Sequence, residues 1–346
     1  MSGEIIQMSP QMSLIFEAMD LSQASPATVS RCGMIYLEPL QLGWLPLVTS
    51  WLSTLPEPLD QKEYQELFED LFNWIVPPAL RMRQKKCKEL VPTSNSNNVV
   101  SLIRLIEMLL SDAVEKEPTS PHIRKWIMGC FAFATVWSIG GTCDGDGRVL
   151  FDAFMRDIIA GKMDKHPMPA AVGKWEHPFE ERGLVYDFMF EMKGKGRWMH
   201  WNEAIKSINY NDKNLKVQDI IVPTMDTVRY TYLMELCIKY GKPLLFVGPT
   251  GTGKSVYVKD KLMNHVEKNL YFPFFVNFSA RTSANQTQNI IMARLDKRRK
   301  GIFGPPMGKK CIIFVDDMNM PALEQYGAQP PIELLRQFLT TASGMT

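Results

Sequence analysis

The sequence has little net charge, few cysteines and no long apolar run. Its 39 Lys and Arg residues nearly balance 37 Asp and Glu residues, so the formal net charge of +2 favours neither nucleic acid nor a membrane as partner. The most apolar stretch, Ile127–Ile139, is about 13 residues long, short of the roughly 20 that cross a bilayer, and it predicts a buried helix. The N-terminus has no basic segment followed by an apolar one, so no signal peptide is expected.

Metal-binding patterns are also weak. The six cysteines are scattered without a Cys-x-x-Cys pair, which is typical of reduced, buried thiols in a cytoplasmic protein. The run that starts at Asp144 begins like a calcium loop, but Arg148 and Met155 stand where ligands belong, so we expect no calcium site. The basic runs Arg81–Lys88 and Lys297–Lys300 lack aromatic neighbours and indicate solvated faces.

The composition is typical of a globular protein, with 45% hydrophobic and 22% charged residues. Near the N-terminus, Met12–Met19 predicts a buried strand and Met34–Leu37 a second short strand. Between them Ser25-Pro26 is a typical helix start, and it predicts a short helix over Ala27–Arg31.

Residues 40–161 show apolar side chains at the three- and four-residue spacing of helices. The predicted helices are Tyr64–Arg83, Val99–Val114, Ile123–Ile139 and Val149–Ala160. Pro77-Pro78 should break or kink the first of them. Residues 162–214 are rich in Pro, Gly and Trp, with short extended runs such as Leu184–Met189, and they indicate a connector with some β structure that is not part of a core.

One motif carries specific chemistry. Gly248–Ser255 matches G-x-x-x-x-G-K-[ST], between a predicted strand, Leu244–Val247, and a predicted helix, Val256–Glu267. This order directs backbone N–H groups and a helix N-terminus at a polyphosphate. Lys254 would then contact the β- and γ-phosphates, and Ser255 would hold Mg²⁺.

A second acidic element follows at a suitable distance. The apolar run Cys311–Val315 predicts a strand that ends in Asp316 and Asp317. Alone this is often only a strand end; together with the phosphate loop it predicts that Asp316 holds Mg²⁺ and that Asp317 polarises the attacking water. The strand Phe274–Phe278 and helix Asn285–Leu295 lie between them. This order predicts a parallel sheet with the site at the carboxyl ends of its strands.

At this point the sequence resembles dynein heavy chains, over residues 3–339. The matching stretches are Gly3–Ile6, Ser22–Tyr36, Val222–Thr224, Val247–Ser255, Phe314–Pro321 and Tyr326–Arg336. The first two are similar to the end of the second AAA+ module and the others to the start of the third. The sequence Asp-Asp-Met-Asn-Met-Pro at 316–321 resembles that of axonemal dyneins, of the inner-arm single-headed type, more than that of cytoplasmic dynein.

The resemblance implies an α/β fold class, in which an incomplete AAA+ P-loop parallel sheet at the C-terminus joins a mostly helical, lid-type domain. The implied domains are the last strands of the second large domain at 1–39, a helical lid at 40–161, a connector with short β segments at 162–215, and a truncated third large domain at 216–346. We expect the missing fourth strand to leave unpaired backbone edges between the strands at Leu244 and Ile312.

Site residues follow from the resemblance position by position. Arg31 matches the arginine finger that the second module offers to the ATP site of the first. Asp317 replaces the usual Glu, and its shorter side chain is expected to slow water activation. The Mg²⁺ ligands are Ser255 and Asp316. The implied nucleotide-binding residues are Val222 and Pro223, near adenine, and Gly248, Pro249, Thr250, Gly251, Thr252, Gly253, Lys254 and Ser255.

The implied function is that of an ATP-binding fragment of a motor that hydrolyses ATP to move along microtubules in cilia and flagella. The cofactors are ATP or ADP with Mg²⁺, and the fragment alone is expected to hydrolyse poorly. Implied partners are neighbouring AAA+ modules and, through other parts of the motor, intermediate chains, light chains and microtubules, in the cytoplasm, cytoskeleton and axoneme. A non-catalytic nucleotide-binding scaffold and a standalone P-loop ATPase are the alternatives, the latter needing a sensor residue and a lid after Asp317.

Overall fold

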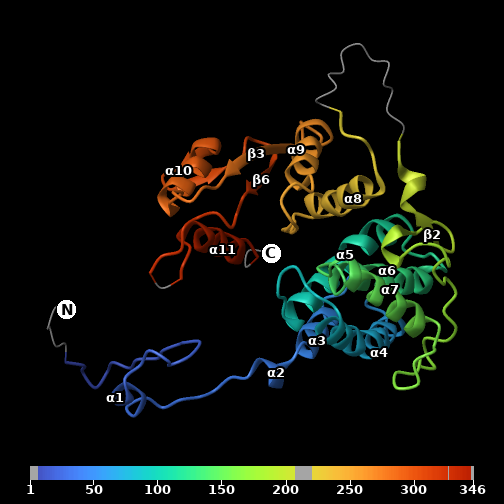
Figure 1. Cartoon of the computed structure of the whole chain (residues 1–346), viewed down its shortest axis with the longest axis horizontal. Coiled ribbons are helices and arrows are strands. Elements are labelled where there is room, and N and C mark those ends of the chain that lie inside the picture. The colour runs from blue at the N-terminus through green and yellow to red at the C-terminus, as the bar shows by residue number, and fades with distance from the viewer. Residues whose placement is uncertain (1–6, 207–219, 326, 344–346) are drawn as a thin grey trace. The chain divides into compact units, whose positions relative to one another are not determined.

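The computed structural model describes residues 7–206, 220–325 and 327–343 (Figure 1). The chain divides into two units, Met1–Gly43 and Trp44–Thr346, and each is treated by itself. The Gly3–Ile6 part of the family resemblance, the domain start near residue 216 and Tyr326 lie outside the described residues.

In the first unit, the structure contains two short helices, α1 (Pro26–Val29) and α2 (Pro39–Leu42). Ser25 caps α1 as predicted, by accepting a hydrogen bond from the Thr28 N–H. The predicted strands Met12–Met19 and Met34–Leu37 are wrong: both segments are loops with exposed side chains, and Ile15 is 96% exposed. A strand needs a neighbouring backbone and a face to bury, and within the described part of this unit neither segment has them.

The second unit begins with a layer of helices. They are α3 (Leu45–Leu52), α4 (Lys62–Lys86), α5 (Asn95–Lys116), α6 (Ile123–Ser138) and α7 (Gly145–Ile159). The four long helices were all predicted, although most begin earlier than their apolar pattern does. Helix α6 packs between α4 and α5 and is buried along nearly all its length. No helix in the described part of the chain has the length and apolar content to cross a membrane.

Pro77 and Pro78 lie inside α4 and do not break it, so of the predicted break or kink the break does not occur. Each proline removes one backbone N–H from the helix ladder and costs about 3 kcal/mol in an isolated helix. Most apolar side chains around the prolines are buried, however, with Ile75, Val76 and Ala79 at 0% exposure. Burial of these side chains against the other helices offsets the lost hydrogen bonds, because each buried aliphatic side chain contributes about 1.5–3 kcal/mol.

The segment after α7 also differs from expectation, since it is part of the core. It contains η1 (Val185–Asp187), the antiparallel strands β1 (Phe188–Glu191) and β2 (Arg197–His200), and η2 (Trp201–Ala204). Its buried aromatic side chains join the same cluster as the helices; they are Trp175, Phe179, Tyr186, Phe188, Phe190, Trp198 and Trp201. Aromatic side chains bury large areas, so a Trp-rich segment without helical periodicity still supplies core.

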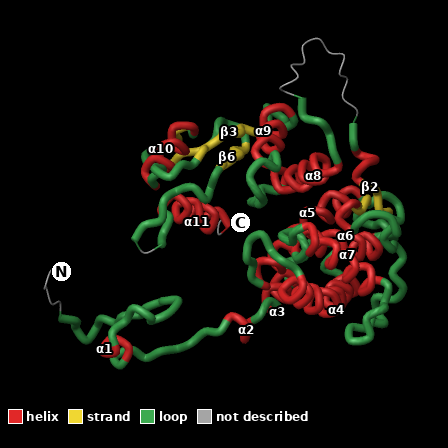
Figure 2. The backbone as a smooth tube through the Cα atoms, in the orientation of Figure 1, coloured by secondary structure: helices red, strands yellow, loops and turns green. Residues whose placement is uncertain are grey.

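The C-terminal region is mixed α/β, as predicted, and Figure 2 shows its two parallel strands side by side. Its elements are α8 (Met225–Lys239), α9 (Lys254–Asn264), β3 (Tyr271–Asn277), α10 (Ala284–Arg294), β4 (Asp296–Arg299), β5 (Ile302–Gly304), β6 (Lys310–Asp316) and α11 (Pro330–Ser343). Strands β3 and β6 pair in parallel from Tyr271↔Lys310 to Asn277↔Asp316. Their carboxyl ends therefore meet at one edge, next to Asp316.

The predicted strand Leu244–Val247 is wrong for the described structure, where these residues belong to no β-ladder. Leu244 and Leu245 are largely exposed. The hairpin of β4 and β5 was not predicted; β4 is exposed at every residue, which confirms that the basic run Lys297–Lys300 begins on a solvated face.

Candidate functional site

The phosphate loop has the backbone that its glycines predict. Gly251 and Gly253 have φ angles of 84° and 80°, in the left-handed region that other residues adopt only at a cost. Gly253 is the N-cap of α9, so the helix begins at Lys254 and its first N–H groups belong to the loop. A helix N-terminus that opens directly from a glycine-rich loop is a ready site for a phosphate group.

Gly253→Ala should destabilise the loop by about 1–2 kcal/mol, because the new Cβ must adopt the left-handed conformation. That Cβ would also lie 3.2 Å from the ring of Tyr257. Chemical unfolding of the purified chain measures the change. Gly145→Ala is a matched control, since Gly145 begins α7, a Cβ added there would meet no atom within 4 Å, and alanine should be tolerated without loss. Equal stability of the two variants would contradict the strain argument.

Lys254 lies against the loop itself. Its ammonium donates hydrogen bonds to the carbonyl oxygens of Gly248 and Pro249, at 2.9 and 2.5 Å, and to Thr252 Oγ1 at 3.2 Å. The predicted phosphate-binding cation is thus held where the loop backbone turns back on itself. An ammonium group with three donors suits this role, because it can exchange carbonyl partners for phosphate oxygens.

The structure brings the loop and β6 together, as predicted. Ser255 Oγ donates to Asp316 Oδ1 over 2.8 Å, across 61 residues of sequence. Lys259 Nζ lies 3.1 Å from Asp316 Oδ2. Burial alone would raise the pKa of Asp316, but the hydrogen bonds from Ser255 and Lys259 outweigh it and hold that pKa below its ordinary value. The Asp316 carboxylate is therefore charged, and its contact with Ser255 holds it beside the last residue of the phosphate loop.

Lys259 was missed by the sequence reasoning. The available signal was its spacing, since it follows Ser255 by four residues on α9 and side chains four apart share a helix face. If Ser255 faces the acidic end of β6, a lysine one turn later can reach the same carboxylate.

Asp317 has an unusual backbone. Its φ angle of 55° makes it the one non-glycine residue with positive φ among the described residues. Asp tolerates this region better than most residues, which is a physical reason for Asp where AAA+ proteins usually carry Glu. Backbone strain of this kind gathers at functional sites. The role of Asp317 in polarising water stays a prediction.

Three other predicted site residues belong to segments outside the loop and β6. Val222 is exposed and Pro223 half-buried, in the extended segment before α8. Arg31 belongs to the first unit, where its exposed guanidinium donates to the Ala27 carbonyl oxygen over 2.9 Å. The roles of all three stay predictions.

The residues present fit a nucleotide with Mg²⁺. Ser255 Oγ and Asp316 Oδ1 are hard oxygen donors on adjoining elements, and Mg²⁺ in such sites takes few protein ligands and completes its shell with phosphate oxygens and water. A dedicated protein cage is not needed, and among the residues described no group of three or more His, Cys, Asp or Glu side chains is arranged to hold a metal ion. The arrangement can bind a polyphosphate and neutralise its charge.

Comparison with known proteins gives a consistent result. Residues 209–343 match a family model described as "P-loop containing dynein motor region", and residues 68–203 match "Dynein heavy chain AAA lid domain". The chain is 64% identical over 344 residues to dynein axonemal heavy chain 12 of Rattus norvegicus and 66% identical to that of Homo sapiens, each covering 98% of this chain. It is 52% identical to dynein axonemal heavy chain 3 of Mus musculus. The chain spans 11% of the length of the first two relatives and 8% of the third.

Proposed function

This chain belongs to the dynein heavy-chain family, and we propose that its loop Gly248–Ser255 binds ATP and ADP with Mg²⁺ within a ciliary motor heavy chain. The contact between Ser255 and Asp316 carries this proposal, because it joins the phosphate loop to the acidic end of β6 in the way that a P-loop nucleotide site needs. The whole motor would couple ATP hydrolysis to movement along microtubules in the axoneme.

Each residue of the proposed nucleotide site has its own role. Lys254 would contact the β- and γ-phosphates, Ser255 and Asp316 would hold Mg²⁺, and Asp317 would orient water. Val222 and Pro223 would lie beside adenine. When bound, Mg²⁺ supplies charge neutralisation at the phosphates. The protein's own contribution is to hold these groups in place, since Asp316 is fixed by its β-ladder and Ser255 by the first turn of α9.

The proposed domains are 1–39, 40–161, 162–215 and 216–346, as the end of one AAA+ module, its lid, a connector and the start of the next module. Neighbouring modules of the same heavy chain would contact them, and intermediate chains, light chains and microtubules would bind elsewhere on the motor. A non-catalytic nucleotide-binding scaffold is the second candidate. It is favoured by Asp317, whose short side chain is less able to reach an attacking water than Glu.

A titration of the purified chain with fluorescent ATP and ADP analogues, with hydrolysis measured in parallel, tests the proposal. We expect saturable binding at one site, in competition with unlabelled ATP. Binding without turnover would favour the scaffold for this chain, and absence of binding both with and without Mg²⁺ would overturn the proposed function.

We also propose that Arg31 stabilises phosphate charge at the ATP site of a preceding module. Arg31→Lys in a full-length heavy chain should slow its ATPase at least tenfold, because lysine cannot present the planar fork of a guanidinium. Steady-state turnover measures this, with Arg281→Lys, an exposed arginine between β3 and α10, as control. Unchanged turnover in the Arg31 variant would make Arg31 an ordinary surface residue.

A further inference from the structure

Asp316, at the acidic end of β6, lies beside Lys259, a cation that is not part of the phosphate-loop motif. Both oxygens of the Asp316 carboxylate are occupied, Oδ1 by the hydroxyl of Ser255 and Oδ2 by the ammonium of Lys259. Lys254 makes its contacts to loop oxygens instead. Among the ion pairs of the described residues, Asp316 takes part in one, with Lys259. The proposed Mg²⁺ ligand therefore already has a positive partner supplied by the chain.

The two members of this pair are held very differently. The Asp316 side chain is 18% exposed and its backbone is fixed in the β-ladder with β3. The Lys259 side chain is 43% exposed, on a long flexible stem that can move its ammonium into water. If the pair opens, the lysine leaves and the carboxylate stays. An ion pair with one half-exposed partner is weak enough to open in this way.

An ammonium group and Mg²⁺ compete for a carboxylate, because each brings positive charge to the same oxygens and the two cations repel each other. From this we infer that Lys259 is a built-in counterion of Asp316, which Mg²⁺ must displace when it binds with nucleotide. The inference rests on the proposed function, since it concerns how that site responds to Mg²⁺. It makes Lys259 a positioning residue that acts through Asp316.

Two consequences of opposite sign follow. Without Mg²⁺, Lys259 cancels the negative charge of Asp316, which would otherwise repel a polyphosphate in the loop. With Mg²⁺, the same lysine opposes metal binding. The site should therefore bind nucleotide with less dependence on Mg²⁺ than a site with a neutral side chain at this position.

Lys259→Met tests this, because methionine keeps most of the length of the side chain and removes the charge. ADP affinity is measured by titration with excess Mg²⁺ and with EDTA, and the ratio of the two dissociation constants is compared between variants. We expect the ratio of Kd in EDTA to Kd in Mg²⁺ to rise roughly two- to tenfold in the variant. The difference should shrink at high ionic strength, because one partner is half-exposed.

Lys268→Met is the matched control, since Lys268 is exposed beyond the end of α9 and its loss changes the net charge equally. Its ratio should equal that of the unsubstituted chain. In an Asp316→Asn background, Lys259→Met should no longer change the ratio. Nucleotide binding with the same ratio in both Lys259 forms overturns this inference alone, whereas absence of binding by the unsubstituted chain in both conditions overturns the proposed function and this inference with it.

Discussion

Lys254→Ala is expected to weaken ATP and ADP binding by roughly 10- to 140-fold for each phosphate hydrogen bond that is lost. The reason is the position of the ammonium, which lies within hydrogen-bonding distance of Gly248 O, Pro249 O and Thr252 Oγ1 in the loop. Hydrogen bonds that involve a charged group contribute about 1.5–3 kcal/mol each, and every 1.4 kcal/mol is tenfold in affinity. The alanine side chain is only a methyl group, so the substitution removes the positive charge and the three hydrogen-bond donors of the lysine together.

Titration with a fluorescent ADP analogue measures this change, and Lys268→Ala controls for the loss of one surface charge. Lys254→Arg separates charge from shape, because it restores the positive charge with a different donor geometry. Circular dichroism of each variant verifies that the loop substitution leaves the chain folded. If Lys254→Ala binds ADP as tightly as the unsubstituted chain, the phosphate site lies elsewhere.

Helices were predictable from the sequence because their signals are local. The apolar spacing of α5 and α7, and the Gly-Lys-Ser sequence that opens α9, depend on residues within a few positions of each other. Strands were predictable only where a partner exists. Strands β3 and β6 pair and were predicted, whereas Leu244–Val247 has a similar apolar pattern and no ladder in the described chain. Strand pairing is a property of two segments, and one segment cannot reveal it.

The candidate site likewise contains features that local sequence patterns predict and features that depend on how distant elements pack. The motif and its spacing predicted that Ser255 and Asp316 meet, since the carboxyl ends of parallel strands share an edge. The contact of Lys259 with Asp316 depends on the rotation of α9 relative to β6, which no local pattern fixes. The left-handed backbone conformation of Asp317 could not be predicted from the sequence either, because most Asp residues adopt ordinary backbone conformations.

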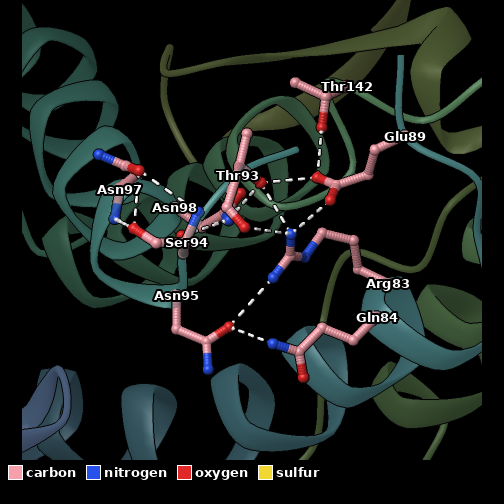
Figure 3. A network of polar contacts seen from close by, with 9 residues as sticks. All are labelled: Arg83, Gln84, Glu89, Thr93, Ser94, Asn95, Asn97, Asn98 and Thr142. Carbon is pink, nitrogen blue, oxygen red and sulfur yellow. Dashed lines mark hydrogen bonds and ion pairs between the residues drawn. The ribbon is translucent and has the colours of Figure 1, made fainter. Parts of the chain in front are cut away.

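A buried polar network in the helical layer has no counterpart in the sequence reasoning, which treated Arg81–Lys88 as a solvated face. Figure 3 shows the contacts of Arg83 with its polar neighbours. Only 1% of this residue is exposed. Its guanidinium donates to Glu89 Oε2 at 2.8 Å, to Thr93 Oγ1 at 2.7 Å and to Asn95 Oδ1 at 3.0 Å. Glu89 also accepts hydrogen bonds from Thr93 and Thr142, so one arginine ties the end of α4 to the start of α5 and to the segment before α7.

Arg83→Ala is expected to destabilise the chain by about 3–5 kcal/mol, the range measured when one partner of a buried ion pair is removed. The cost arises because Glu89 and Asn95 lose donors in a site with little access to water. Urea unfolding of the helical layer, followed by circular dichroism, measures it. Gln84→Ala is the neighbouring control: Gln84 also donates to Asn95 Oδ1, but from an exposed position, so its loss should cost less than about 1 kcal/mol.

The pH dependence of that difference tests the charge rather than the packing. Burial alone would raise the pKa of Glu89, but the hydrogen bonds from Thr93, Arg83 and Thr142 hold it below its ordinary value of 4.5. A carboxyl group whose pKa is lowered in the folded state stabilises the protein above its unfolded pKa, and this contribution is lost as the pH falls through the folded pKa. The cost of Arg83→Ala should therefore be fully present near neutral pH and should shrink as the pH falls below about 4.5, because the unfolded chain then takes up a proton on Glu89 while the folded, unsubstituted chain keeps this carboxylate charged. The ion pair itself is lost only when the pH passes the lower pKa of the folded state. A cost that stays constant down to pH 3 would mean that Arg83 acts through packing and its hydrogen bonds to Thr93 and Asn95, without a contribution from the charge of Glu89.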